Sequence, residues 1–151
     1  MKKKTIIQMI IIIVLLIAIL FIAIYLNKDN NSTFTNMHRN NIKKTDRINM
    51  YVFYGLTCPH CEDLYKMLKE NKNYEKYYDL YSFEVWYDKE NQKFMDDVSK
   101  KLDKNISGVP YIIIGDKTFS GYSKTNSKTI LNTIKEQYKN KNYKDIIYNI
   151  K

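Results

Sequence analysis

The stretch Tyr54-Gly55-Leu56-Thr57-Cys58-Pro59-His60-Cys61 decides how this chain of 151 residues is interpreted. It holds the only two cysteines of the sequence, separated by two residues. A helix that starts here places the first sulfur at its exposed N-terminus, among free backbone N–H groups, and the second sulfur within bonding distance. Pro59 fits the first helical turn, where its missing N–H costs nothing. The stretch predicts a redox-active pair with Cys58 as nucleophile and Cys61 as buried resolving thiol.

The residues on either side of the pair predict a strand before it and a helix after it. Residues 50–54 are an apolar run of β-formers without polar alternation, as expected for a central parallel strand covered on both faces. Thr57 is the expected helix cap. Apolar residues then recur at spacings of three and four, which predicts one buried helical stripe. They are Cys61, Leu64, Tyr65 and Leu68.

The rest of the chain predicts a small α/β domain. Alternating and helical patterns give two further helices and three further strands, the last two joined by the turn Gly115-Asp116-Lys117. The expected ranges are strand 81–87, helix 91–102, strands 111–114 and 118–120, and helix 124–138. A parallel start with a hairpin at the end predicts a four-stranded α/β sandwich over residues 48–151.

The N-terminal segment predicts a membrane anchor. Residues 1–4 are basic, and residues 5–26 are almost continuously apolar, long enough as a helix to span about 33 Å. The positive-inside tendency keeps the basic tip cytoplasmic and the rest outside. A cleaved signal peptide is the alternative, but no A-x-A cleavage pattern follows the apolar run. Residues 27–47 are polar, and we expect a flexible linker there.

Composition argues against nucleic-acid binding, a zinc site and a purely structural disulfide. The net charge is +9, but no RNA-binding or helix-turn-helix pattern accompanies it, so we expect no nucleic-acid partner. A zinc site needs two more ligands, and the only histidines are His60, inside the motif, and His38, in the expected linker. A purely structural disulfide would close too short a loop to contribute much stability. We therefore expect no metal and no cofactor.

Cys58-Pro59-His60-Cys61 after a buried strand, together with Gly108-Val109-Pro110 before the hairpin, resembles the thioredoxin-like superfamily across residues 48–140. The resemblance implies a three-layer sandwich with a four-stranded mixed sheet. It also implies that Pro110 is cis beside the disulfide and that Val109 pairs with an extended substrate peptide.

The motif itself has the form found in DsbA-type disulfide oxidases. The chain has no room for their helical insertion before the cis proline. It carries Val52 where thioredoxins keep a buried acid.

These observations predict an extracytoplasmic protein disulfide oxidoreductase that oxidises dithiols of exported proteins through a Cys58–Cys61 disulfide. Its imidazole neighbour, His60, would stabilise the Cys58 thiolate and make the pair more oxidising. Its partners would be cysteine-containing exported proteins and a membrane redox protein that recycles the pair. Two alternatives stay open: a reductase supplied by a membrane electron donor, and a non-catalytic binding module that needs no cysteines.

Overall fold

A computed structural model describes residues 3–27 and 33–150 of the chain. They belong to two compact units, divided after Ser32. Residues 1–2 and 28–32, parts of the expected basic tip and linker, lie outside the described residues.

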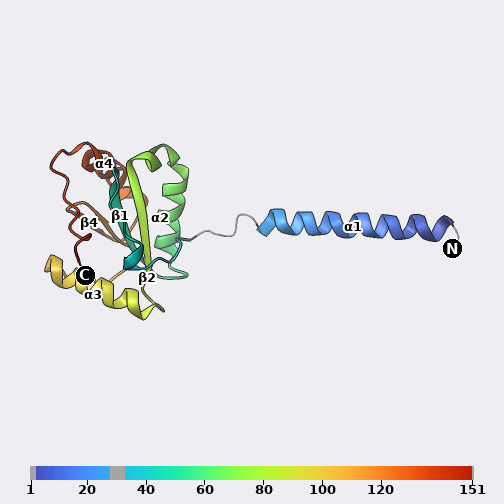
Figure 1. Ribbon diagram of the computed structural model, residues 1–151, viewed down its shortest axis with the longest axis horizontal. Helices are drawn as coiled ribbons and strands as arrows, with labels where there is room; N and C mark the ends of the chain where they lie inside the picture. Colours follow the sequence, from blue (N-terminus) through green and yellow to red (C-terminus); the bar gives the residue numbers. More distant parts are fainter. Residues whose placement is uncertain (1–2, 28–32, 151) are drawn as a thin grey trace. The chain divides into compact units, whose positions relative to one another are not determined.

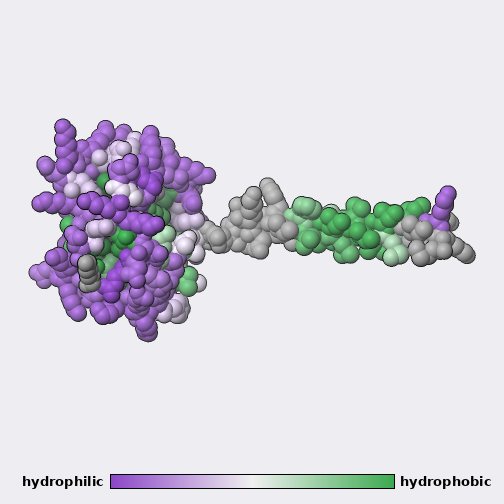
Figure 2. All heavy atoms as spheres, viewed as in Figure 1, coloured by the Kyte–Doolittle hydropathy of each residue, from purple (hydrophilic) through white to green (hydrophobic). Residues whose placement is uncertain are grey.

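The first unit is one helix, α1 (Lys3–Asn27). Its large apolar side chains between Ile7 and Ile22 are exposed, and Figure 2 shows their hydrophobic surface. Within the described part of the chain, no helix is both long enough and apolar enough to cross a membrane.

The second unit is built on a four-stranded mixed sheet with the strand order β2-β1-β3-β4. Every residue of β1 (Ile48–Tyr54) is buried, as the unbroken apolar run predicts. It pairs in parallel with β2 (Tyr78–Glu84) and antiparallel with β3 (Tyr111–Ile114). The short edge strand β4 (Lys117–Ser120) completes the predicted hairpin. The mixed four-stranded sheet is therefore confirmed.

Helices cover both faces of the sheet and form three layers (Figure 1). On one face, α2 (Pro59–Glu70) and α4 (Lys124–Lys139) enclose a core with β1. On the other face, α3 (Lys89–Leu102) contributes Phe94 and Val98 to a second core. A 3-10 turn (Lys72–Tyr77) connects α2 to β2. The disulfide lies in the first of these cores.

Strand β2 differs from its prediction, which was 81–87 instead of Tyr78–Glu84. The reason is the buried side chain of Glu84, whose carboxylate accepts hydrogen bonds from the backbone N–H groups of the following residues. These bonds turn the chain out of the sheet. Trp86 and Tyr87 consequently lie in the loop between β2 and α3.

The expected linker 27–47 is wrong over its second part, because the folded unit begins at Thr33. Residues 33–42 form a strap along β2, which includes a 3-10 turn (Arg39–Asn41). Phe34 is buried in the first core, and its carbonyl accepts a hydrogen bond from the Tyr54 hydroxyl. The Met37 amide donates to the Ser82 carbonyl. An aromatic residue in a polar segment was the sequence signal for this packing.

Candidate functional site

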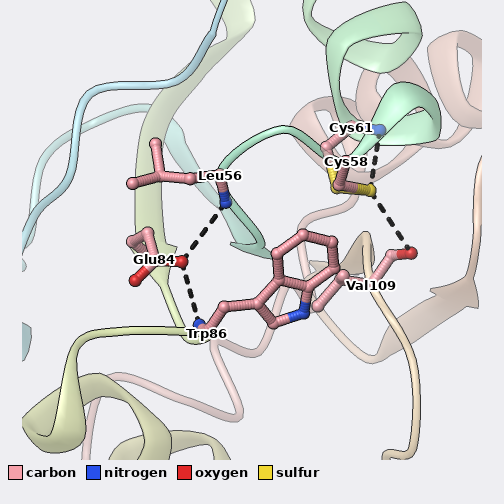
Figure 3. The surroundings of a disulfide bond; sticks show 6 residues. All are labelled: Leu56, Cys58, Cys61, Glu84, Trp86 and Val109. Atoms are coloured by element: carbon pink, nitrogen blue, oxygen red, sulfur yellow. Dashed lines mark hydrogen bonds between the residues drawn. A yellow bond between two sulfur atoms is a disulfide. The ribbon is translucent and has the colours of Figure 1, made fainter.

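The cysteine pair lies where β1 gives way to α2. Strand β1 ends at Tyr54, and the Cys58 amide donates to the Gly55 carbonyl at 3.2 Å to close the turn between them. Cys58 and Cys61 form a disulfide, with their Cα atoms 5.2 Å apart (Figure 3). Strand, turn and helix thus bring the two sulfurs together as the motif predicts.

Cys58, rather than Thr57, caps helix α2. The Sγ atom of Cys58 accepts a hydrogen bond from the Cys61 backbone N–H at 3.3 Å. Thr57 has a φ of 64°, in the left-handed region, and so stands outside the capping position. Pro59 occupies the first turn, as expected. A thiolate at Cys58 would keep this N–H donor and the positive end of the helix dipole, and both favour the charged form.

Both cysteines are enclosed. Cys58 is 4% exposed and Cys61 is 1% exposed, so the first sulfur is less open than the sequence suggested. The Val109 carbonyl oxygen lies 3.8 Å from the Cys58 sulfur. The Val109–Pro110 peptide bond is cis, as the resemblance implied. Pro110 is held in turn by its carbonyl, which accepts a hydrogen bond from the Gly121 amide.

His60 takes no part in the hydrogen bonds of the cysteine pair. Its side chain is exposed, and within residues 33–150 it makes no hydrogen bond or ion pair. Any influence on the Cys58 thiolate would therefore act through its charge and not through a fixed contact.

Glu84, whose buried carboxylate binds the turn before Cys58, was not predicted from the sequence as a site residue. It is 3% exposed, and it accepts hydrogen bonds from four backbone N–H groups. One belongs to Leu56, in the cysteine turn, at 3.3 Å, and the others to Trp86, Tyr87 and Asp88. The signal for it was an acidic residue between two apolar ones, Phe83 and Val85.

Trp86 was also missed as a site residue. Its indole ring packs directly on Gly55, where an added Cβ would overlap the ring. Figure 3 shows the ring reaching from the loop after β2 towards Val109 and the disulfide. The sequence predicts Trp86 within a strand, whereas it lies in the loop after β2.

Two side chains near the turn, those of Tyr54 and Asp88, have shifted pKa values. Burial raises the pKa of the Tyr54 phenol to about 12, and the carboxylates of Glu84 and Asp88 add to the effect. The pKa of Asp88 is lowered, first by the hydrogen bond from Asn36 and then by that from the Asn91 amide.

Val52 is fully buried among apolar residues, so the buried acid of this site lies on β2 instead of β1.

The described residues contain no group of three or more His, Cys, Asp or Glu side chains arranged to hold a metal ion.

Several solved structures are similar to this chain. Solved structures similar to the chain include the glutaredoxin grx-1 from Archaeoglobus fulgidus, with 24% identity, a TM-score of 0.41, and coverage of 65% of this chain and 96% of that one. A thioredoxin from Trypanosoma brucei brucei has 11% identity, a TM-score of 0.47, and coverage of 74% and 96%. A thioredoxin-like protein from Clostridium perfringens has 24% identity, a TM-score of 0.43, and coverage of 71% and 86%. No curated protein matches the chain.

The family is shown by a family model described as a thioredoxin-like domain, which matches residues 35–142. The match starts within the strap and includes the disulfide and Pro110. Because it spans well over half of the sequence, the chain belongs to the thioredoxin-like domain family.

Proposed function

We propose that this chain is an extracytoplasmic thiol–disulfide oxidoreductase that oxidises paired thiols of exported proteins through its Cys58–Cys61 disulfide. The observation that carries the proposal is the position of the disulfide. It lies at the first turn of α2, with the Cys58 sulfur accepting a backbone N–H and facing the Val109 carbonyl. Thiol–disulfide exchange requires such a reactive sulfur with a second one beside it.

The reaction would proceed in two exchanges. A substrate thiolate attacks the Cys58 sulfur, the Cys58–Cys61 bond breaks, and Cys61 leaves as a thiolate that takes up a proton. A second substrate thiolate then attacks the substrate sulfur of the mixed disulfide, and Cys58 leaves as a thiolate. The cysteine pair gains the two electrons that the substrate loses; one of the two substrate protons goes to Cys61 and the other to solvent.

The cap geometry favours this direction. The Cys61 N–H and the N-terminus of α2 would stabilise a Cys58 thiolate, which makes Cys58 the better leaving group in the second exchange. The nearby His60 would add positive charge when protonated. Stabilising the reduced form makes the pair more oxidising.

Val109 and Pro110 would bind the substrate backbone. Within the described residues the Val109 amide makes no hydrogen bond, and its carbonyl lies beside Cys58. An extended peptide whose cysteine reaches Cys58 could pair with this backbone edge. Pro110 has no backbone N–H and so donates no hydrogen bond at this edge.

The deciding experiment is the reduction potential of the pair. The full chain, kept in a mild detergent, is equilibrated in glutathione buffers, and the disulfide fraction is measured by thiol alkylation and mass spectrometry. We expect a potential near or above about −150 mV. A potential near or below about −250 mV would overturn the oxidase and indicate a reductase supplied by an electron donor.

Cysteine variants separate the enzyme from a binding module. Cys58→Ser should abolish oxidation of a reduced dithiol peptide. If the double variant Cys58→Ser, Cys61→Ser kept the cellular role of the protein, a non-catalytic binding function would replace the enzyme.

We also propose that residues 5–26 anchor the protein in a membrane, with the N-terminus cytoplasmic. Support comes from the sequence alone, in which residues 5–26 are almost continuously apolar and follow Lys2, Lys3 and Lys4. A membrane redox protein would then be the natural partner for recycling the pair.

Membrane extraction tests the anchor. The full chain should stay with membranes after alkaline carbonate washing, and a variant lacking residues 5–26 should not. Protease added outside intact spheroplasts should digest the domain. Release of the full chain by carbonate would contradict the anchor, and protection from protease would contradict the orientation.

A further inference from the structure

Trp86 combines exposure with rigid support. It is the only tryptophan of the chain, and 44% of it is exposed. Its backbone N–H donates to Glu84 at 2.9 Å, and its carbonyl accepts from the Gln92 side chain at 3.1 Å. Its ring packs on Gly55. A large apolar side chain that is fixed on one side and open on the other has a surface available for a partner.

The contact with Gly55 joins this ring to the cysteine turn. Because a Cβ at Gly55 would overlap the indole, only glycine allows the ring to lie so close to the turn. The same carboxylate, Glu84, binds the amides of both Leu56 and Trp86. Leu56 is itself 41% exposed. The backbones of both residues are therefore bonded to one carboxylate, and the Trp86 ring lies between this carboxylate and Val109, on the side of the disulfide (Figure 3).

We propose that the exposed face of Trp86 is an apolar platform that determines substrate specificity. It would bind an apolar side chain that flanks the reacting cysteine of the substrate polypeptide. This inference rests on the proposed function, because a substrate sulfur bonded to Cys58 brings its neighbouring residues over the surface around Cys58. Aromatic and aliphatic anchors of this kind supply most of the binding energy in small interfaces.

The chemistry of the platform selects an apolar occupant. The carboxylate that binds the Trp86 amide, that of Glu84, is buried, and it accepts hydrogen bonds from four backbone N–H groups of the protein itself. It is thus not available to a basic substrate. The exposed surface of Trp86 is its indole ring, and covering the ring removes apolar area from water.

Paired peptides test the platform. Two reduced dithiol peptides differ only in the residues flanking the cysteines, leucine in one and serine in the other. We expect the full chain to oxidise the leucine peptide about tenfold faster, equivalent to about 1.4 kcal/mol. In Trp86→Ala this ratio should fall to near one. Tyr138→Ala is the matched control, since Tyr138 is also 44% exposed but lies on α4, and it should keep the ratio.

Fluorescence of Trp86 gives a second test that leaves the ring in place. In the variant Cys61→Ser, the Cys58 thiolate attacks a peptide whose cysteine carries a thionitrobenzoate disulfide, and the thionitrobenzoate thiolate leaves. The mixed disulfide between Cys58 and the peptide then persists, because no second thiol resolves it. Because Trp86 is the sole tryptophan, its emission should shift to the blue with the leucine peptide and stay unchanged with the serine peptide.

The outcomes distinguish the two proposals. Oxidation of both peptides at equal rates by the wild type, an unchanged ratio in Trp86→Ala, or no emission shift with the leucine peptide would overturn the platform and leave the oxidoreductase intact. Exchange with neither peptide would overturn the proposed function and the platform together.

Discussion

The carboxylate of Glu84 accepts a hydrogen bond from the backbone N–H of Leu56 at 3.3 Å, and this bond ties strand β2 to the turn before Cys58. Three further backbone N–H groups, from the loop after β2, share the same side chain. One buried residue therefore organises two loops that flank the disulfide.

Replacing Glu84 by glutamine should destabilise the fold. The amide keeps the size of the side chain but can accept at only one end, so two of the four N–H donors lose their acceptor. We expect the free energy of unfolding to fall by roughly 2–4 kcal/mol, measured by urea denaturation. Glu70→Gln, at an exposed position of α2, should change it by less than about 0.5 kcal/mol. Equal stability of the two variants would contradict the role of Glu84.

Removing the imidazole of His60 should make the cysteine pair less oxidising. We expect the reduction potential, measured in glutathione buffers, to fall by on the order of 30 mV, because the variant lacks the imidazole two residues after Cys58 that would stabilise its thiolate. The control is His38→Ala, because His38 lies on the strap and faces Asp88 and Glu90. A potential unchanged in His60→Ala would show that the exposed imidazole does not act on the thiolate.

The fold should lose stability in alkali. Burial is the main cause that raises the pKa of Tyr54, Tyr78 and Tyr143 to about 12. These phenols ionise near pH 10 in the unfolded chain, so between pH 10 and pH 12 the folded state holds protons that the unfolded state has lost. Stability is therefore fully present below pH 10 and decreases as the pH rises to 12.

Urea denaturation at a series of pH values measures this loss. Tyr78→Phe should reduce its slope, and Tyr87→Phe should not, because Tyr87 is 71% exposed. Stability that stays constant from pH 9 to pH 12 would be incompatible with these raised pKa values.

Phe34 should be essential to the domain although it lies before the first strand. It is 3% exposed and packs against the rings of Tyr54 and Tyr65. Phe34→Ala is expected to lower the free energy of unfolding by about 3–5 kcal/mol, as for other buried phenylalanines. Lys44→Ala, an exposed position nearby in the sequence, should have little effect. A neutral Phe34→Ala would return residues 33–42 to the role of a flexible linker.

Local patterns explain why much of this fold could be predicted. The apolar run of β1, the helical stripe after Cys61 and the turn before β4 each depend on neighbours in the sequence. The two cysteines are separated by only two residues at a predicted helix start, so their disulfide could also be expected from the sequence.

The failures all involve contacts between distant segments. Strand β2 ends at Glu84 because the Glu84 carboxylate binds backbone N–H groups of the following loop. Phe34 is buried because it packs against Tyr54 of β1 and Tyr65 of α2. Trp86 lies beside the disulfide because Gly55 admits its ring. None of these contacts leaves a periodic pattern, so only single unusual residues, such as an acid between apolar neighbours, could have pointed to them.

The strap also affects how molecules of this protein meet one another. Strand β2 is an edge strand, and an open edge invites strands of other molecules to pair and aggregate. The Ser82 carbonyl accepts from the Met37 amide, and the Glu84 amide donates to the Asn36 side chain. The strap therefore already bonds the Ser82 carbonyl and the Glu84 amide, which could otherwise pair with a strand of another molecule. This protects the edge of the sheet against self-association.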